Sequence, residues 1–246
     1  MRTILITGAT AGFGLATAKL LANDNKLILL ARRQERLDEL QKSLGDNVYV
    51  AAVDVTNPQQ VKDFYNSLPA DFKNIDVLVN NAGFALGMEP AQEANFDNWQ
   101  QMVDTNISGL LRMTRLVVGD MVSRGSGQII NIGSVAGHVP YKGGNVYGAT
   151  KAFVWQFSRG LRTDLFGTGV KVTNIEPGAA ETEFASVRFK DEQKGKDFYA
   201  GWKPLKPEDI ANTVKWVIDQ PPHVNIDNIE IMALAQASAG MVIDKG

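Results

Sequence analysis

The sequence predicts an α/β fold, a doubly wound parallel sheet of seven strands with helices on both faces. Three observations support this prediction. Short apolar runs alternate with helical patterns along the chain, polar residues follow several of these runs, and a glycine-rich turn separates the first strand from the first helix. With 246 residues and no linker, repeat or low-complexity tract, the chain is expected to form a single domain spanning residues 1–246.

The first strand is predicted at residues 2–7 and the first helix at residues 15–21, with the sequence GATAGFG between them. Its glycines, Gly8, Gly12 and Gly14, would let the backbone approach a pyrophosphate, to which the helix N-terminus offers free N–H groups. The spacing is one residue removed from the GxGxxG fingerprint, and many glycines in turns are only turn residues. Its place between a strand and a helix favours nucleotide binding.

The second predicted strand, residues 26–31, is followed at once by Arg32 and Arg33, with Arg36 nearby. In dinucleotide-binding folds an acidic residue here contacts the ribose of NAD, whereas arginine accommodates the 2′-phosphate of NADP. A guanidinium group can bond two phosphate oxygens at once. Arg32 and Arg33 therefore favour NADP, while Arg36 could simply belong to the solvated helix predicted at residues 34–44.

The third predicted strand, residues 48–53, leads into Asp54. The Asp54 carboxylate could accept a hydrogen bond from the adenine amino group of a cofactor. It could equally cap the following turn, where Thr56, Asn57 and Pro58 are typical turn residues. The sequence leaves both roles open.

A helix at residues 61–68 and a strand at residues 75–79 precede the sequence NNAG, residues 80–83. Two amides and a glycine just beyond a strand can satisfy exposed backbone and let a cofactor pass close by. A long helix predicted over residues 96–124 contains Asn106. Asparagine in a helix interior usually faces solvent, so a functional role for Asn106 needs other support.

A fifth predicted strand, residues 128–133, ends at Ser134, and Tyr147 and Lys151 follow four positions apart on a helix that continues to about residue 166. Residues i and i+4 share one helix face, so the phenol and the ammonium would share one site. A free tyrosine has a pKa of about 10, which a neighbouring ammonium lowers. Ligands bind at the carboxyl ends of strands in such sheets, so Ser134 is expected to join them. A Tyr-x-x-x-Lys pair alone is common by chance.

The sixth predicted strand, residues 170–175, leads into Glu176, Pro177 and Gly178 at the same edge of the sheet. Residues 182–202 mix charges and aromatic rings without clear periodicity and are predicted to form a mobile lid over the site. A helix at residues 207–218 and a seventh strand at residues 228–232 complete the fold.

Composition narrows the function classes. A net charge of -2 gives no broad basic field for nucleic acid. The absence of cysteine excludes disulfides and thiolate metal sites, and two histidines, His138 and His223, argue against a histidine-based metal site. The chain begins at Met1 and runs directly into a strand, without a charged lead or a long apolar stretch, so we expect a cytoplasmic protein with no membrane segment.

Several motifs occur in order: TGATAGFG at 7–14, NNAG at 80–83, Asn106, Ser134, Tyr147-x-x-x-Lys151 and Pro177-Gly178-x-x-x-Thr182. Together they resemble the classical short-chain dehydrogenase/reductase family over essentially the whole chain. The resemblance implies a Rossmann-type fold, a catalytic tetrad of Asn106, Ser134, Tyr147 and Lys151, and a homotetramer built through the two long helices. With the local patterns, it points to these NADP-binding residues: Thr7, Gly8, Ala9, Thr10, Ala11, Gly12, Phe13, Gly14, Arg32, Arg33, Asp54, Val55, Asn81, Ala82, Gly83, Tyr147, Lys151, Pro177, Gly178 and Thr182.

Four segments are similar to the bacterial NADP-dependent 3-hydroxy acid dehydrogenases, a group that includes serine or allo-threonine dehydrogenases and malonic semialdehyde reductases. They are ARRQERL at 31–37, GMEPAQ at 87–92, PYKGGNVYGATKAFV at 140–154 and TEFASVRFK at 182–190. This similarity implies a substrate such as L-serine, L-allo-threonine, 3-hydroxyisobutyrate or 3-hydroxypropionate, interconverted with its 3-oxo acid or semialdehyde.

In the implied mechanism Ser134 bonds the substrate oxygen, Tyr147 takes its proton, and hydride passes to NADP. By the same resemblance Asn106 would hold a water that links Lys151 to solvent. A substrate carboxylate needs a cationic partner, which Arg188 or Lys190 in the lid could supply, although charged lid residues are often only solvated.

Two alternatives stay open. One is an NADPH-dependent reductase of another carbonyl class, such as ketones, sugars or acyl thioesters. The chain has Glu230-Ile231-Met232-Ala233 where carrier-protein ketoacyl reductases of the family often have Asp-Gly-Gly, which weakens the thioester version. The other is a non-enzymatic dinucleotide sensor, for which nothing in cofactor binding alone would require Ser134 beside Tyr147 and Lys151.

Overall fold

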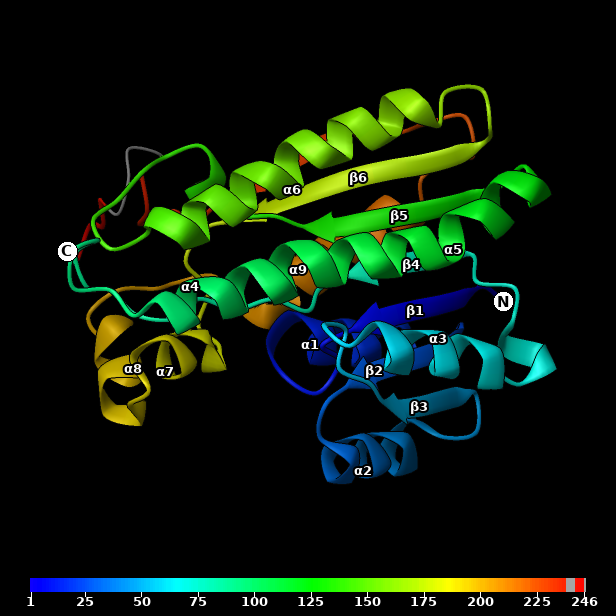
Figure 1. Ribbon diagram of the computed structural model, residues 1–246, viewed down its shortest axis with the longest axis horizontal. Helices are drawn as coiled ribbons and strands as arrows, with labels where there is room; N and C mark the ends of the chain where they lie inside the picture. The colour runs from blue at the N-terminus through cyan, green and yellow to red at the C-terminus, as the bar shows by residue number, and fades with distance from the viewer. Residues whose placement is uncertain (238–241, 246) are drawn as a thin grey trace.

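The computed structural model describes residues 1–237 and 242–245, which contain a seven-stranded parallel sheet in the order β3-β2-β1-β4-β5-β6-β7 (Figure 1). The strands are β1 (Thr3–Thr7), β2 (Lys26–Ala31), β3 (Val48–Ala52), β4 (Val77–Asn80), β5 (Gly127–Ile132), β6 (Val170–Pro177) and β7 (Asn228–Ile231). The strand order reverses between β1 and β4, as in a doubly wound sheet. The fold class predicted from the sequence is confirmed.

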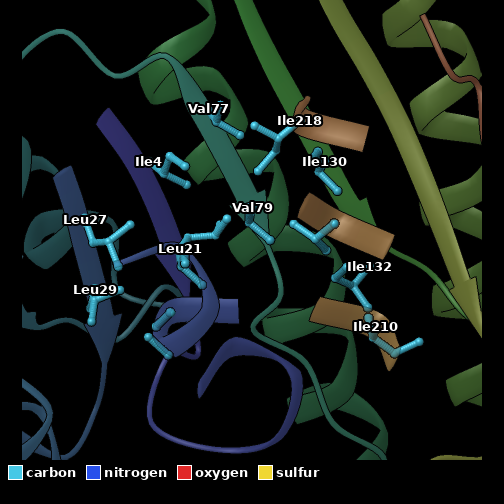
Figure 2. Packing of buried hydrophobic residues seen from close by; sticks show 14 of the residues in the cluster. Ile4, Leu21, Leu27, Leu29, Val77, Val79, Ile130, Ile132, Ile210 and Ile218 are labelled. Carbon is cyan, nitrogen blue, oxygen red and sulfur yellow. The ribbon is translucent and has the colours of Figure 1, made fainter. Parts of the chain in front are cut away.

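Helices cover both faces of the sheet, in two hydrophobic clusters. The helices are α1 (Gly12–Leu21), α2 (Gln34–Leu44), α3 (Pro58–Ser67), α4 (Phe96–Val103), α5 (Leu110–Arg124), α6 (Asn145–Asp164), α7 (Glu183–Phe189), α8 (Glu192–Phe198) and α9 (Pro207–Ile218). One cluster joins α1, α2 and α9 to the sheet, and the other joins α3 and α5 to the opposite face. Figure 2 shows the first cluster, where strand residues Ile4, Val77, Val79, Ile130 and Ile132 meet Leu21, Ile210 and Ile218.

Burial on both faces explains why the strands read as unbroken apolar runs. In β2 the four side chains of residues 27–30 are all 0% exposed, although they point alternately to opposite faces of the sheet. Burying one such side chain contributes about 1.5–3 kcal/mol. Among the described residues no helix combines the length and the apolar character needed to cross a membrane.

The long helix predicted over residues 96–124 is continuous but changes its winding in the middle. Residues Asp104–Gly109 form a π-helical segment between α4 and α5. This segment contains Asn106, which is only 2% exposed. Asn106 is therefore an exception to the tendency of asparagine inside a helix to face solvent, and it lies in a π-helical segment, a feature that is frequent at functional sites.

Residues 182–202 are also more regular than their sequence suggests. They contain two helices of seven residues each, α7 and α8. The side chains of Thr182 and Asp191 cap them by accepting hydrogen bonds from backbone N–H groups of the first turn. A helix this short makes about two turns, too few for an apolar periodicity to show.

All strands point their carboxyl ends toward the side of the molecule where α7 and α8 lie (Figure 1). The glycine-rich turn after β1, the arginines after β2, NNAG after β4 and Ser134 after β5 are therefore brought to one edge of the sheet. Segments that are separated by more than a hundred residues in sequence meet there.

Candidate active site

A cavity of about 720 Å³ runs along this edge of the sheet. Of the residues predicted to bind cofactor or substrate, those that line it are Gly8, Thr10, Ala11, Gly12, Phe13, Arg32, Arg33, Asp54, Val55, Asn81, Ala82, Gly83, Ser134, Tyr147, Lys151, Pro177, Gly178, Thr182 and Arg188. The remaining predicted residues, Thr7, Ala9, Gly14 and Asn106, support the wall from behind. The Thr7 hydroxyl, for example, accepts hydrogen bonds from the N–H groups of Asn81 and Ala82.

The glycine-rich turn has the geometry of an anion cradle. Gly8 and Gly12 have φ angles of 67° and 49°, in the region that favours glycine. A Cβ on Gly14 would lie 2.4 Å from the carbonyl oxygen of Gly8, so only glycine lets α1 come this close to β1. No side chain caps the N-terminus of α1 at Ala11. Its first N–H groups are thus free to bind phosphate oxygens.

Asn81 fastens this turn to the end of β4. Its side-chain amide donates to the carbonyl oxygens of Thr7 and Gly8, at 2.8 and 3.2 Å. These bonds explain why an asparagine follows the strand, and they hold the cavity wall between the two central strands. Asp54 plays the capping role that the sequence left open, because its Oδ1 accepts from the N–H and the hydroxyl of Thr56.

The predicted phosphate-binding arginines line one end of the cavity. Arg33 also lies 3.8 Å from Glu183 at the start of α7, and the same carboxylate pairs with Arg36 at 3.1 Å. Arg36 does not line the cavity. The guanidinium groups of Arg32 and Arg33 are thus placed to meet an anionic group there, whereas Arg36 forms an exposed ion pair.

The opposite end of the cavity holds Ser134, Tyr147 and Lys151, which are each 7–8% exposed. The Lys151 ammonium lies 5.8 Å from the centre of the Tyr147 ring and donates to the carbonyl oxygen of Ile132 at 2.8 Å. The predicted meeting of hydroxyl, phenol and ammonium is therefore present in the structure.

The electrostatics of this end differ from the prediction. Burial raises the pKa of the Tyr147 phenol, as does nearby Tyr141, whereas a hydrogen bond with Ser134 and the charge of Arg188 lower it. Burial also lowers the pKa of Lys151 to about 8. The pKa of Tyr147 is thus raised and not lowered as expected, because desolvation is the largest cause and the neighbouring cation that lowers the pKa is Arg188, not Lys151.

Asn106 supports the site from the π-helical segment. Its side chain accepts from the N–H of Phe84 at 3.0 Å and donates to the carbonyl oxygen of the same residue at 2.9 Å. It also donates to the hydroxyl of Thr150, next to Lys151, at 3.1 Å. The side chain thus joins the loop after β4 to α6 and does not line the cavity.

Arg188 is a buried cation on the cavity wall, only 8% exposed. Its guanidinium donates to the carbonyl oxygens of Gly87 and Gly143, at 3.1 and 3.0 Å, and to the Tyr141 hydroxyl at 2.7 Å. Its central carbon lies 5.8 Å from the centre of the Tyr147 ring. Lys190, the other predicted candidate, is exposed and does not line the cavity.

Sequence reasoning missed the residues that hold Arg188. Tyr141 lines the cavity and both stacks on the guanidinium, at 5.2 Å, and accepts from it. Gly143 has a φ of 76°, and a Cβ there would lie 2.4 Å from the carbonyl oxygen of Met88. An aromatic residue shortly before Gly143 and Gly144, directly ahead of Tyr147, is the signal that could have found this segment. Within the described residues no group of three or more His, Asp or Glu side chains could hold a metal ion.

Comparisons with known proteins agree with this geometry. The short chain dehydrogenase family profile matches residues 2–193. The NADP-dependent 3-hydroxy acid dehydrogenase YdfG of Escherichia coli is 54% identical over 245 residues, 98% of this chain and 99% of that protein. The serine 3-dehydrogenase of Rhizobium radiobacter is 50% identical over 243 residues, 98% of this chain and 97% of that protein.

Among solved structures, the closed form of serine dehydrogenase complexed with NADP+ has a TM-score of 0.96 and 53% sequence identity, with 99% of each chain covered. The serine dehydrogenase of Escherichia coli has a TM-score of 0.85 and 50% identity, covering 96% of this chain and all of that one. The fold, the profile match and these identities together show that the chain belongs to the short-chain dehydrogenase family.

Proposed function

We propose that this protein is an NADP-dependent oxidoreductase that interconverts a 3-hydroxy acid or β-hydroxy amino acid with its 3-oxo acid or semialdehyde. Residues 1–246 would act as a single catalytic domain, with residues 182–202 as its lid. The observation that carries the proposal is the position of Arg188, a buried guanidinium beside Tyr147. In the described part of the chain it forms no ion pair.

The free donors of Arg188 suit a carboxylate. A guanidinium has five N–H donors, and three of them reach Gly87, Tyr141 and Gly143, which leaves two for a ligand. A buried cation without a carboxylate partner is costly unless a ligand supplies the charge. The separation of 5.8 Å from the Tyr147 ring suits a short acid whose hydroxyl meets Tyr147 while its carboxylate meets Arg188. The class includes 3-hydroxyisobutyrate, 3-hydroxypropionate, L-serine and L-allo-threonine.

The cavity suits NADP. The uncapped N-terminus of α1 and the positive-φ glycines would hold the pyrophosphate, while Arg32 and Arg33 would hold the 2′-phosphate. Lys151, at the other end, would bond the nicotinamide ribose. The chemistry that the dinucleotide supplies when bound is the acceptance of hydride at its nicotinamide ring. YdfG of Escherichia coli is named as NADP-dependent, which supports the same cofactor here.

In the oxidation direction the chain's own residues orient the alcohol and remove its proton. Ser134 would hold the substrate oxygen, and Tyr147 as phenolate would accept the hydroxyl proton. Burial raises the pKa of Tyr147, so the phenolate needs positive charge nearby. Arg188 supplies it in the protein alone, and the oxidised nicotinamide of bound NADP would add to it. In the reduction direction Tyr147 as phenol would return the proton. Asn106 is proposed to act through the loop after β4 and Thr150, to which it is bonded.

A substrate panel tests the proposal. Production of NADPH from NADP would be measured with the four hydroxy acids, and consumption of NADPH with an acetoacetyl thioester and a cyclic ketone. We expect kcat/KM for the hydroxy acids, and for their oxo forms in the reverse direction, to exceed that for the thioester and the ketone by at least about tenfold. Only a substrate with a carboxylate can bond to Arg188. A preference for the neutral carbonyls would favour the alternative, a reductase of another carbonyl class.

We further propose that the protein assembles as a homotetramer through α4, α5 and α6. Large apolar side chains are exposed along these elements, with Phe96 at 68%, Val122 at 38% and Phe166, just beyond α6, at 80%. Sedimentation velocity would give the mass of the assembly. A monomer at micromolar concentration would refute this part of the proposal without affecting the chemistry.

A further inference from the structure

A buried carboxylate outside the proposed chemistry lies next to the cavity. Glu176, near the end of β6, is 0% exposed. One of its oxygens lies 2.7 Å from Nε2 of His138, and the other accepts from the side-chain amide of Asn228 at 2.7 Å. A carboxylate only accepts hydrogen bonds, so Nε2 of His138 carries the hydrogen in this pair. Burying this carboxylate without partners would cost several kcal/mol, so loss of either hydrogen bond is unfavourable.

His138 stands at the end of the short turn that begins with Ser134. Residues Val135–Gly137 form one 3₁₀ turn, closed by hydrogen bonds from the N–H groups of Gly137, His138 and Val139. The turn is packed tightly, since a Cβ on Gly137 would lie 2.8 Å from the backbone carbon of Lys151. The ring of His138 also meets the edge of Trp155 on α6 at 4.8 Å. The turn is therefore a rigid link between Ser134 and His138.

This turn is fastened to β6 at both of its ends. At one end the Ser134 hydroxyl donates to the carbonyl oxygen of Pro177, at a long 3.4 Å. At the other end His138 bonds to Glu176, the residue immediately before Pro177. The first bond is weak at this length, and Ser134 must release it to hold a substrate oxygen. The second bond is short and charge-assisted, so it can keep the turn in place while Ser134 acts.

We propose that His138 is a positioning residue that holds the Ser134 hydroxyl at the reacting end of the cavity through its bond to Glu176. The proposal rests on the proposed function, because Ser134 has a reacting partner only if the site turns over an alcohol or carbonyl. His138 does not line the cavity, and it would act on the reaction only by way of Ser134.

Variants of the two Glu176 partners separate positioning from stability. His138→Ala removes the bond from the turn, whereas Asn228→Ala removes the bond from β7, together with the bond that Asn228 accepts from Asn174, and leaves the bonds of the turn in place. We expect His138→Ala to lower kcat about tenfold with little change in KM for the hydroxy acid, since small displacements of a reacting group mainly slow the chemical step. Asn228→Ala should lower the melting temperature but not kcat. His138→Gln places an N–H donor near the position of Nε2 and should retain most of the activity, which His138→Asn, with a shorter side chain, should not.

A double-mutant cycle tests whether His138 acts through Ser134. In a Ser134→Ala background, His138→Ala should cause no further loss of kcat, because the hydroxyl it positions is gone. An independent tenfold loss in that background would overturn the proposal, as would equal losses of kcat in His138→Ala and Asn228→Ala.

Hydrogen exchange gives a readout that does not depend on turnover. His138→Ala should speed exchange of the amides of residues 137–139, while Asn228→Ala should not. If the unaltered protein turns over no hydroxy acid with NADP, the proposed function fails, and hydrogen exchange still reports on the fastening of the turn. Unchanged exchange in His138→Ala would contradict the positioning role whatever the substrate.

Discussion

Replacing Arg188 by methionine should weaken recognition of the substrate carboxylate while leaving the reacting groups in place. Methionine keeps much of the length and apolar character of the side chain but removes the buried guanidinium. A hydrogen bond to a charged group contributes about 1.5–3 kcal/mol, and each 1.4 kcal/mol changes a rate or equilibrium constant about tenfold. Loss of one such bond to the carboxylate would lower kcat/KM for a 3-hydroxy acid by about tenfold to about 150-fold.

The assay compares a 3-hydroxy acid with its methyl ester, which has the same hydroxyl but no charge. Arg188→Met should lower kcat/KM for the acid by the stated factor and leave the value for the ester nearly unchanged. Lys190→Met is the matched control, because Lys190 is an exposed cation of the same segment whose side chain, in the described part of the chain, bonds only Asn98, at 3.4 Å. It should affect neither substrate. An equal loss for acid and ester in Arg188→Met would refute carboxylate recognition by this residue.

The same substitution will also cost stability, which the assay must allow for. Arg188 joins α7 to the loops of Gly87 and Gly143 and to Tyr141 by three hydrogen bonds of its charged guanidinium, each worth about 1.5–3 kcal/mol. Rates should therefore be measured well below the melting temperature of the variant. Because the ester and the acid are measured on the same folded protein, their ratio is insensitive to the folded fraction.

Three other outcomes are expected. Arg32→Ala and Arg33→Ala should each raise the KM for NADP about tenfold while leaving the KM for NAD nearly unchanged, since only NADP carries the 2′-phosphate. Equal effects on both cofactors would contradict the assignment of these arginines to the 2′-phosphate. Burial raises the pKa of Tyr147, so the phenolate is a minor form at neutral pH. Its fraction increases about tenfold per pH unit, so kcat/KM for oxidation should increase toward alkaline pH, and a profile that is flat from pH 6 to 8 would exclude Tyr147 as the proton acceptor. Lys151→Met should abolish turnover without destabilising the protein. The fall in pKa from 10.5 to about 8 corresponds to about 3 kcal/mol against the buried charge, which offsets the contribution of about 1.5–3 kcal/mol from the charged hydrogen bond to Ile132. Urea unfolding would measure the difference, and a clearly less stable variant would show that the charge is well accommodated.

The features that could be predicted from the sequence depend on residues that lie close together in the chain. The strands could be predicted because both of their faces are buried, so that a run such as residues 27–30 is apolar throughout. The glycine-rich turn and the arginines after β2 could be placed because each follows a strand whose carboxyl end reaches the common edge. The i, i+4 spacing of Tyr147 and Lys151 on α6 needed only the helical repeat.

The features that the sequence did not predict depend on distant partners. The guanidinium of Arg188 donates to the carbonyl oxygens of Gly87 and Gly143, which are 101 and 45 residues away in sequence. No local sequence pattern predicts such contacts. The π-helical winding at Asn106 covers only the six residues Asp104–Gly109 between α4 and α5, and the sequence pattern of the long helix did not indicate it. The raised pKa of Tyr147 is a balance between burial and neighbouring charges, and burial is a property of the folded chain.

Substitution of Tyr147 by phenylalanine tests the central claim most directly. The ring would still pack against Phe184, whose centre lies 5.5 Å away, and only the phenolic hydroxyl would be lost. Hydride transfer from a 3-hydroxy acid, followed as NADPH formation, should fall by about 10²–10⁴-fold, while NADP binding measured by fluorescence titration stays within about twofold. Turnover at the rate of the unaltered protein would contradict the account, because a group other than Tyr147 would then have to move the proton.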